Sequence, residues 1–135
     1  MSKKKSPTAA VRDFLEASGY EVGNVQKYIA AIKRFQDLFG FCDLVAVGET
    51  ELLFVQVTSS AHYADRKAKV EVNRVAQRIA RIPQAHVWVC GTRYGKREES
   101  GVLFLRIGEL LPKTGDNNYE WTERVIAVRS QIVAV

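Results

Sequence analysis

Two short apolar segments separated by a polar turn constrain this chain more than any other feature. Residues Phe39–Gly48 and Leu52–Thr58 are rich in Val, Leu and Phe, and Glu49–Glu51 lies between them. Runs this short, with turn residues between them, are typical of strands rather than of a helix. Apart from Asp43, Gln56 and Thr58, the two segments are largely apolar on both faces, which predicts a hairpin inside a sheet that is covered on both sides.

The turn predicts which residues of this hairpin face one another. If Gly48 and Glu51 pair across a two-residue turn, Asp43 lies directly opposite Gln56. Side chains alternate along a strand, so Asp43, Gln56 and Thr58 project from one face, whereas a slip of one residue would separate the first two. A charged Asp43 in such a strand needs a partner or a function. Hydrogen bonds from backbone amides near a strand end are the structural alternative.

This arrangement resembles the core of the PD-(D/E)xK nuclease superfamily. In that family an Asp on one strand precedes a (D/E)-x-K sequence on the next, and here Asp43 precedes Gln56-Val57-Thr58. The segments Asp37–Ala46 and Val55–Ser59 are similar to small phage-type members related to Holliday junction resolvases. The chain departs from the family pattern because Gln56 replaces an acid, Thr58 replaces the lysine and Cys42 stands where proline often precedes the Asp.

The resemblance implies a restriction-endonuclease-like fold and a metal-dependent nuclease acting on DNA. Glu16, on a preceding helix, would correspond to the family's helix-borne acid. The implied oxygen ligands for Mg²⁺ (or Mn²⁺) are Asp43, Gln56, the backbone carbonyl of Val57, and Glu16. Thr58 can donate a hydrogen bond to a water or a phosphate, but it supplies no positive charge. Either Lys67 or Lys69 would therefore act as the surrogate catalytic cation.

Periodicity predicts two helices around this hairpin. Ser6 is a good N-cap with Pro7 at the first helical position, and Gly19 ends this helix. A strand near residues 20–25 and a short helix or irregular turn near residues 28–35 follow. The clearest helix covers Tyr63–Ile82, with a predicted buried stripe of Ala68, Val72, Val75, Ala76 and Ile79.

The C-terminal half completes an α/β domain with a mixed sheet of four to six strands. Strands are predicted at residues 85–90, 102–107, 121–128 and 131–135, with loops at 91–101 and 110–120. The helix before residue 85 is long enough for the crossover that a parallel strand pair requires. The apolar strand at 132–135 could pair across a homodimer.

Basic side chains follow the hairpin and offer contacts to nucleic-acid phosphates. The candidates are His62, Arg66, Arg74, Arg93, Lys96 and Arg97. A charged helix face is usually only a solvated face, which is the alternative for each of these residues. The formal charge of +5 and the isoelectric point near 9.4 permit a polyanionic partner without requiring one.

Length and composition predict one domain at residues 7–135 after a disordered basic tail at residues 1–6. No apolar run is long enough to span a membrane. Cys42 and Cys90 lie in apolar runs, and unpaired buried thiols fit the cytoplasm, or the host cytoplasm if the phage-type resemblance reflects a viral source.

Three functions remain open on the sequence. The first is a metal-dependent endonuclease that cleaves DNA, including branched DNA such as a Holliday junction. The second is a nuclease-fold protein that binds nucleic acid without cutting it, because the motif lacks one acid and the lysine. The third is a protein-interaction module that uses the C-terminal apolar strand.

Overall fold

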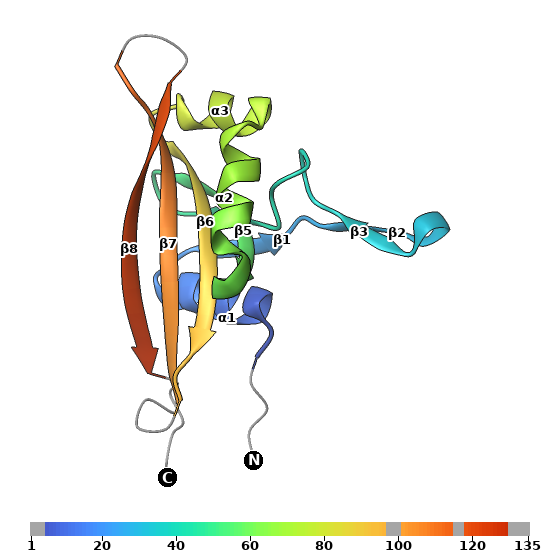
Figure 1. The fold of residues 1–135 in the computed structure, drawn as a ribbon, viewed down its shortest axis with the longest axis vertical. Coiled ribbons are helices and arrows are strands. Elements are labelled where there is room, and N and C mark those ends of the chain that lie inside the picture. Colours follow the sequence, from blue (N-terminus) through green and yellow to red (C-terminus); the bar gives the residue numbers. More distant parts are fainter. Residues whose placement is uncertain (1–4, 97–100, 115–117, 130–135) are drawn as a thin grey trace.

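A mixed six-stranded sheet with helices on both faces forms the body of this α/β domain in the computed structural model, which describes residues 5–96, 101–114 and 118–129 (Figure 1). The elements in chain order are α1 (Pro7–Ala17), β1 (Glu21–Asn24), β2 (Lys27–Ile29), η1 (Ala30–Ile32), β3 (Arg34–Gln36), β4 (Leu44–Val47), β5 (Leu52–Ser59), η2 (Ser60–His62), α2 (Tyr63–Glu71), α3 (Arg74–Ala80), β6 (Ala85–Tyr94), β7 (Val102–Pro112) and β8 (Tyr119–Arg129). The sheet order is β1-β4-β5-β6-β7-β8, so the predicted α/β class with a mixed sheet of four to six strands is confirmed.

Only the β5–β6 pair of this sheet is parallel among the described strands. The chain passes from β5 through α2 and α3 before it enters β6, as a parallel crossover requires. The other neighbours are antiparallel. No helix in the described part of the chain is both long enough and apolar enough to cross a membrane.

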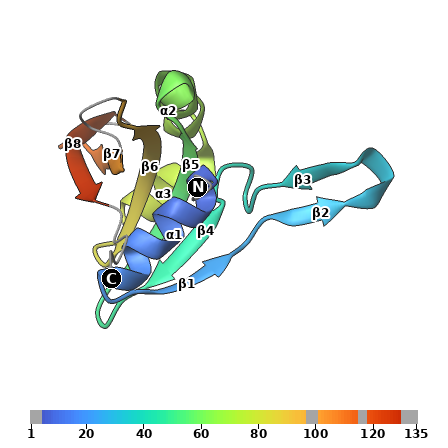
Figure 2. The same ribbon diagram turned by 90° about the horizontal axis from the view of Figure 1, so that it is seen from below.

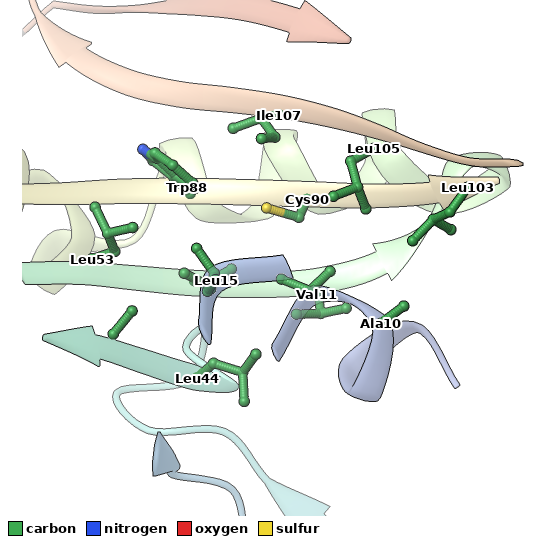
Figure 3. Close-up of a cluster of buried hydrophobic side chains, with 13 residues drawn as sticks. Ala10, Val11, Leu15, Leu44, Leu53, Trp88, Cys90, Leu103, Leu105 and Ile107 are labelled. Carbon is green, nitrogen blue, oxygen red and sulfur yellow. The ribbon is translucent and has the colours of Figure 1, made fainter. Parts of the chain in front are cut away.

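The first helix begins and ends as predicted. The hydroxyl of Ser6 accepts a 3.2 Å hydrogen bond from the amide of Ala9, and Pro7 occupies the first turn. Gly19 adopts a positive φ of 99° just beyond the helix, which glycine accepts without a Cβ penalty. Figure 3 shows Val11 and Leu15 of α1 against the strands, where both side chains are buried.

The central hairpin has the predicted register. Leu44 of β4 pairs with Val55 of β5, and the amide of Gly48 donates a 2.8 Å hydrogen bond to the carbonyl of Glu51 across the turn. One face of β5 packs against α1 through Leu53 and its alternate neighbours. The opposite face carries the polar side chains that were predicted to share a surface.

The predicted single helix over Tyr63–Ile82 is wrong at its centre. Glu71 ends α2, and the side chain of Asn73 accepts hydrogen bonds of 3.0 Å from two amides of the first turn of α3. Asn favours this capping role over a helix interior because its side chain competes for the backbone. The break changes the helix phase, so Ala68 and Val72 are exposed instead of forming the predicted buried stripe.

The segment predicted as a short helix or irregular turn at residues 28–35 is a second hairpin. Strands β2 and β3 pair antiparallel and are joined by the single turn η1. Figures 1 and 2 show this hairpin, which we call the arm, extending away from the body of the domain. The helical spacing of its apolar residues was misleading because these side chains are not packed on a core: Ile32 is 60% exposed.

The C-terminal strands are longer than predicted. β6 continues to Tyr94, so Arg93 belongs to a strand rather than to the predicted loop. β7 continues to Pro112 through part of the predicted connection at 110–120. The predicted strand at 131–135, with the dimer contact proposed for it, lies outside the described residues, as do residues 1–4 of the predicted tail.

Two glycines make room for Tyr63, an almost fully buried aromatic side chain of the core. A Cβ atom on Gly91 would lie 2.9 Å from Cδ1 of Tyr63, and one on Gly108 would meet the Tyr63 hydroxyl. The hydroxyl donates a 2.9 Å hydrogen bond to Glu123 of β8. Tyr63 thereby fixes the start of α2 against β6 and β7.

Both cysteines are unpaired and buried, as predicted. Burial raises the pKa of the Cys42 and Cys90 thiols to about 12. Neither thiol is therefore an activated nucleophile.

Candidate functional site

A polar pocket of about 450 Å³ opens where the arm joins the body of the domain. It lies between the start of α1, the base of the arm, the central hairpin and α2. Its lining residues are Thr8, Gln26, Phe35, Gln36, Asp37, Gly40, Asp43, Gln56, Val57, Arg66 and Lys69. The pocket therefore contains Asp43 and Gln56, the residues on which the sequence prediction rests.

Asp43 is buried at the floor of the pocket and receives three hydrogen bonds. Its Oδ2 atom accepts one from the side-chain nitrogen of Gln56 and one from the backbone amide of Val57, each 2.7 Å long. Its Oδ1 atom accepts a 2.9 Å hydrogen bond from the side-chain nitrogen of Gln26. Only 3% of Asp43 is exposed. The predicted juxtaposition of Asp43 and Gln56 is confirmed.

A second carboxylate, which the sequence analysis missed, approaches Asp43. The side-chain nitrogen of Gln26 donates 2.9 Å hydrogen bonds to both Asp37 Oδ1 and Asp43 Oδ1, so one amide joins the two acids. Gln26 and Asp37 lie at the ends of the two arm strands that are nearest the body. A predicted hairpin at residues 27–36 would have placed Gln26 opposite Asp37, but the sequence analysis predicted a short helix or irregular turn there.

The surroundings of Asp43 oppose its ionisation. Burial, together with a hydrogen bond and charge repulsion from the neighbouring Asp37 carboxyl, raises the pKa of Asp43 to about 7. The Val57 amide and the Arg66 guanidinium act in the opposite direction on this pKa. A cation placed beside the two carboxyls would offset both unfavourable effects.

Gln56 carries the one buried side-chain polar atom without a hydrogen-bond partner among the described residues. Its Nε2 atom donates to Asp43 and, at 3.4 Å, to the carbonyl of Val57, which leaves Oε1 buried and unpaired. Turning the amide over would direct Oε1 at a carboxylate oxygen of Asp43. An unsatisfied buried acceptor costs about 1–3 kcal/mol, so a group that donated a hydrogen bond to this oxygen, or a cation beside it, would offset that cost.

Two basic side chains of α2, Arg66 and Lys69, also line the pocket. Arg66 and Lys69 are three residues apart, and that spacing places them on one face of the helix. Lys67 points elsewhere: its Nζ forms a 3.0 Å ion pair with Glu123 and lies 5.5 Å from the ring centroid of Trp121. Of the two lysines that the sequence offered as surrogate cations, Lys69 alone lines the pocket.

Glu16 does not line the pocket, in contrast to its predicted role. It is exposed in the last turn of α1, whereas Thr8 in the first turn of that helix is a lining residue. Eight residues of helix separate these two positions by about 12 Å along the axis. Thr58, which was predicted to contact a water or a phosphate, is buried and is likewise not a lining residue of the pocket.

The other predicted phosphate contacts are dispersed. His62, Arg74 and Lys96 are exposed and lie outside the pocket lining. The Arg93 guanidinium carbon lies 4.3 Å from the ring centroid of Phe104. Arg97 lies outside the described residues.

The pocket's donor set fits a hard divalent cation. Asp37, Asp43 and the free Oε1 atom of Gln56 are oxygen donors, which are the ligands that Mg²⁺ prefers. Within the described ranges no group of three or more His, Cys, Asp or Glu side chains is placed to hold a metal ion. The described residues that line the pocket include no Cys or His, which are the usual ligands of a zinc site.

No protein-family model, curated protein sequence or solved structure matches this chain. Its function is therefore inferred from the pocket and from the surfaces around it.

Proposed function

We propose that this protein is a metal-dependent nuclease that hydrolyses DNA phosphodiester bonds in the pocket of Asp37 and Asp43. One observation carries the proposal: two carboxyls joined by Gln26 share one pocket with the basic side chains of Arg66 and Lys69. Phosphodiester hydrolysis needs a negatively charged oxygen site for an ion beside a positively charged site for the phosphate. The pocket supplies both within one cavity.

The pocket residues divide into two roles. Asp37, Asp43, the Oε1 atom of Gln56 and the carbonyl of Val57 would hold Mg²⁺ or Mn²⁺. The bound ion would supply Lewis-acid polarisation of a phosphoryl oxygen and a more acidic bound water. Gln26 keeps the two carboxyls together, and Arg66 and Lys69 would orient the phosphate and offset its charge.

The order of the elements supports a PD-(D/E)xK assignment. A helix and a strand precede the hairpin that carries Asp43 and Gln56, and a helical crossover then leads to a parallel strand. Asp37 would take the place of the acid that the sequence analysis assigned to Glu16. Lys69 would take the place of the missing motif lysine. The assignment remains part of this proposal.

The test is cleavage of labelled DNA by the purified full chain. Linear duplex, single-stranded and four-way-junction substrates are incubated with Mg²⁺, with Mn²⁺ and with EDTA. We expect cleavage with either metal, no cleavage in EDTA, and a loss of at least 10²-fold in Asp43→Asn, in the range typical of removing a group that stabilises the transition state. Asp65→Asn, which removes an exposed acid of α2 outside the pocket lining, is the matched control. Persistent cleavage by Asp43→Asn would refute the catalytic assignment.

A specific observation favours a second candidate, binding without cleavage. Both oxygens of Asp43 are already occupied by hydrogen-bond donors, and Thr58 offers no charge in place of the family's lysine. In that case the wild type binds DNA in a salt-dependent manner but cuts none of the substrates with any metal. Asp43→Asn would then leave the affinity unchanged or slightly raised, because a negative charge near the phosphate is removed.

A further inference from the structure

The arm presents one face that runs directly into the pocket. Tyr28 of β2 and Phe35 of β3 are paired residues in the arm register, and side chains two positions away along a strand share the same face. On the side nearest the body, the positions two residues from Tyr28 and Phe35 are Gln26 and Asp37, and these two side chains are joined by a hydrogen bond. The Tyr28–Phe35 pair therefore lies one step, about 7 Å, beyond the acids of the pocket.

This aromatic pair is exposed to solvent. The two ring centroids are 5.1 Å apart with an interplanar angle of 62°, which is an edge-to-face arrangement. Tyr28 is 52% exposed and Phe35 is 65% exposed. Phe35 also contributes to the pocket lining. An aromatic platform on a projecting arm, continuous with a polar pocket, has the character of a binding surface rather than of a core.

The charge on the arm identifies the kind of partner. Lys27, Lys33 and Arg34 are all exposed, and residues 25–36 contain no Asp or Glu. Two copies of the arm would therefore repel each other. An aromatic surface flanked by cations is instead complementary to a nucleic-acid strand, whose bases stack on rings and whose phosphates attract Lys and Arg.

We propose that Tyr28 and Phe35 form a stacking platform for an unpaired nucleobase adjacent to the phosphate held by Arg66 and Lys69. The preferred substrate would then contain a single-stranded segment, because a base inside a duplex cannot present its face to the arm. This inference rests on the proposed function, since it places the base beside the same pocket. It adds the class of substrate and the residues that select it.

The test measures binding in EDTA, where metal-dependent cleavage does not occur. Affinity is determined by fluorescence anisotropy for an oligothymidylate and for an abasic strand of equal length, which carries the same phosphates without bases. We expect Phe35→Ala and Tyr28→Ala each to weaken oligothymidylate binding by about tenfold. Both variants should bind the abasic strand as the wild type does. Phe35→Trp should restore the affinity because it keeps an aromatic face.

Ile32→Ala is the matched control, because Ile32 is an equally exposed apolar residue in the turn of the same arm. It should leave both affinities unchanged. Equal losses on the two strands, or no loss with Phe35→Ala, would overturn the stacking assignment. A concentration-dependent dimer in light scattering that Phe35→Ala dissociates would also overturn it, since the arm would then bind a second copy of the chain.

The outcomes also separate this inference from the proposed function. If base-dependent binding is found but no metal supports cleavage, the platform stands and the nuclease proposal fails. If cleavage depends on Asp43 but Phe35→Ala changes neither affinity nor substrate ranking, the nuclease proposal stands and the platform fails.

Discussion

The side-chain amide of Gln56 donates a 2.7 Å hydrogen bond to Asp43 Oδ2, and its own carbonyl oxygen is left buried and without a partner. A Glu at this position would place a second negative charge against Asp43. Gln instead keeps a neutral oxygen beside the acid and stabilises its carboxylate by donation. In the proposed metal site, this pair would bring one negative charge to the ion instead of the two that a pair of carboxylates would bring.

The raised pKa of Asp43, about 7, predicts a pH dependence of stability in metal-free protein. The unfolded state has an ordinary Asp pKa near 4. Between about pH 4 and 7, the folded state therefore keeps a proton on Asp43 that the unfolded state has lost. Protonation of Asp43 therefore stabilises the fold at low pH, and this contribution is lost as the pH rises through 7. Asp43→Asn removes the effect.

Urea unfolding at pH 5 and pH 8 measures this contribution. On going from pH 5 to pH 8, the wild type should lose roughly 2–3 kcal/mol of unfolding free energy relative to Asp43→Asn. The comparison between the two proteins cancels the titration of groups that do not interact with Asp43. Parallel pH profiles would contradict the raised pKa of Asp43.

Mg²⁺ should stabilise the fold more at pH 8 than at pH 6. The ion needs the ionised form of Asp43, and that form predominates only above its pKa of about 7. A ligand that binds the folded state raises the melting temperature by mass action. The measurement is thermal unfolding at fixed pH with Mg²⁺ or with EDTA, with Asp43→Asn as the variant expected to respond least. An equal shift at both pH values would show that the ion binds elsewhere.

Arg66 and Lys69 should contribute to the salt dependence of DNA binding, whereas Lys67 should not. A side chain that neutralises a phosphate adds about 0.7–0.9 to the slope of log affinity against log salt. Arg66→Ala and Lys69→Ala should each reduce the slope by this amount. Lys67→Ala is the control on the same helix, because Lys67 is paired with Glu123 away from the pocket. If the three variants gave the same slope, the assignment of Arg66 and Lys69 as phosphate contacts would be wrong.

Gly91→Ala should destabilise the fold by about 1–3 kcal/mol, because the added methyl group overlaps the ring of Tyr63 in a packed core. Gly23→Ala in β1 is the control: its Cβ would meet nothing within 4 Å. Both substitutions are measured by urea unfolding. Equal stability of the two variants would mean that Tyr63 can move aside at little cost.

The central hairpin could be predicted from sequence because its determinants are local. Strand alternation and a two-residue turn fix the register, so Asp43 and Gln56 had to meet if the hairpin formed. The start of α1 could likewise be predicted from Ser6 and Pro7. These features depend on neighbouring residues and on side-chain period, which the sequence displays directly.

The remainder of the site depends on how distant segments approach one another. Asp37 reaches Asp43 only because the arm folds back on itself, and the helical spacing of its apolar residues concealed the hairpin. Glu16 was assigned by analogy, but the length of α1 separates it from the end of the helix that lines the pocket. Asn73 caps the start of α3 and so ends the predicted single helix. The prediction followed the apolar pattern and gave this local capping preference too little weight.

The most direct test of the central claim compares Asp37→Asn with Glu16→Gln, measuring Mn²⁺ binding by isothermal titration and cleavage by the DNA assay. The structure places Asp37 beside Asp43 and places Glu16 outside the pocket lining. We predict that Asp37→Asn loses most Mn²⁺ affinity and most cleavage, while Glu16→Gln retains both. Loss of both properties in Glu16→Gln, with Asp37→Asn unaffected, would contradict the proposed site.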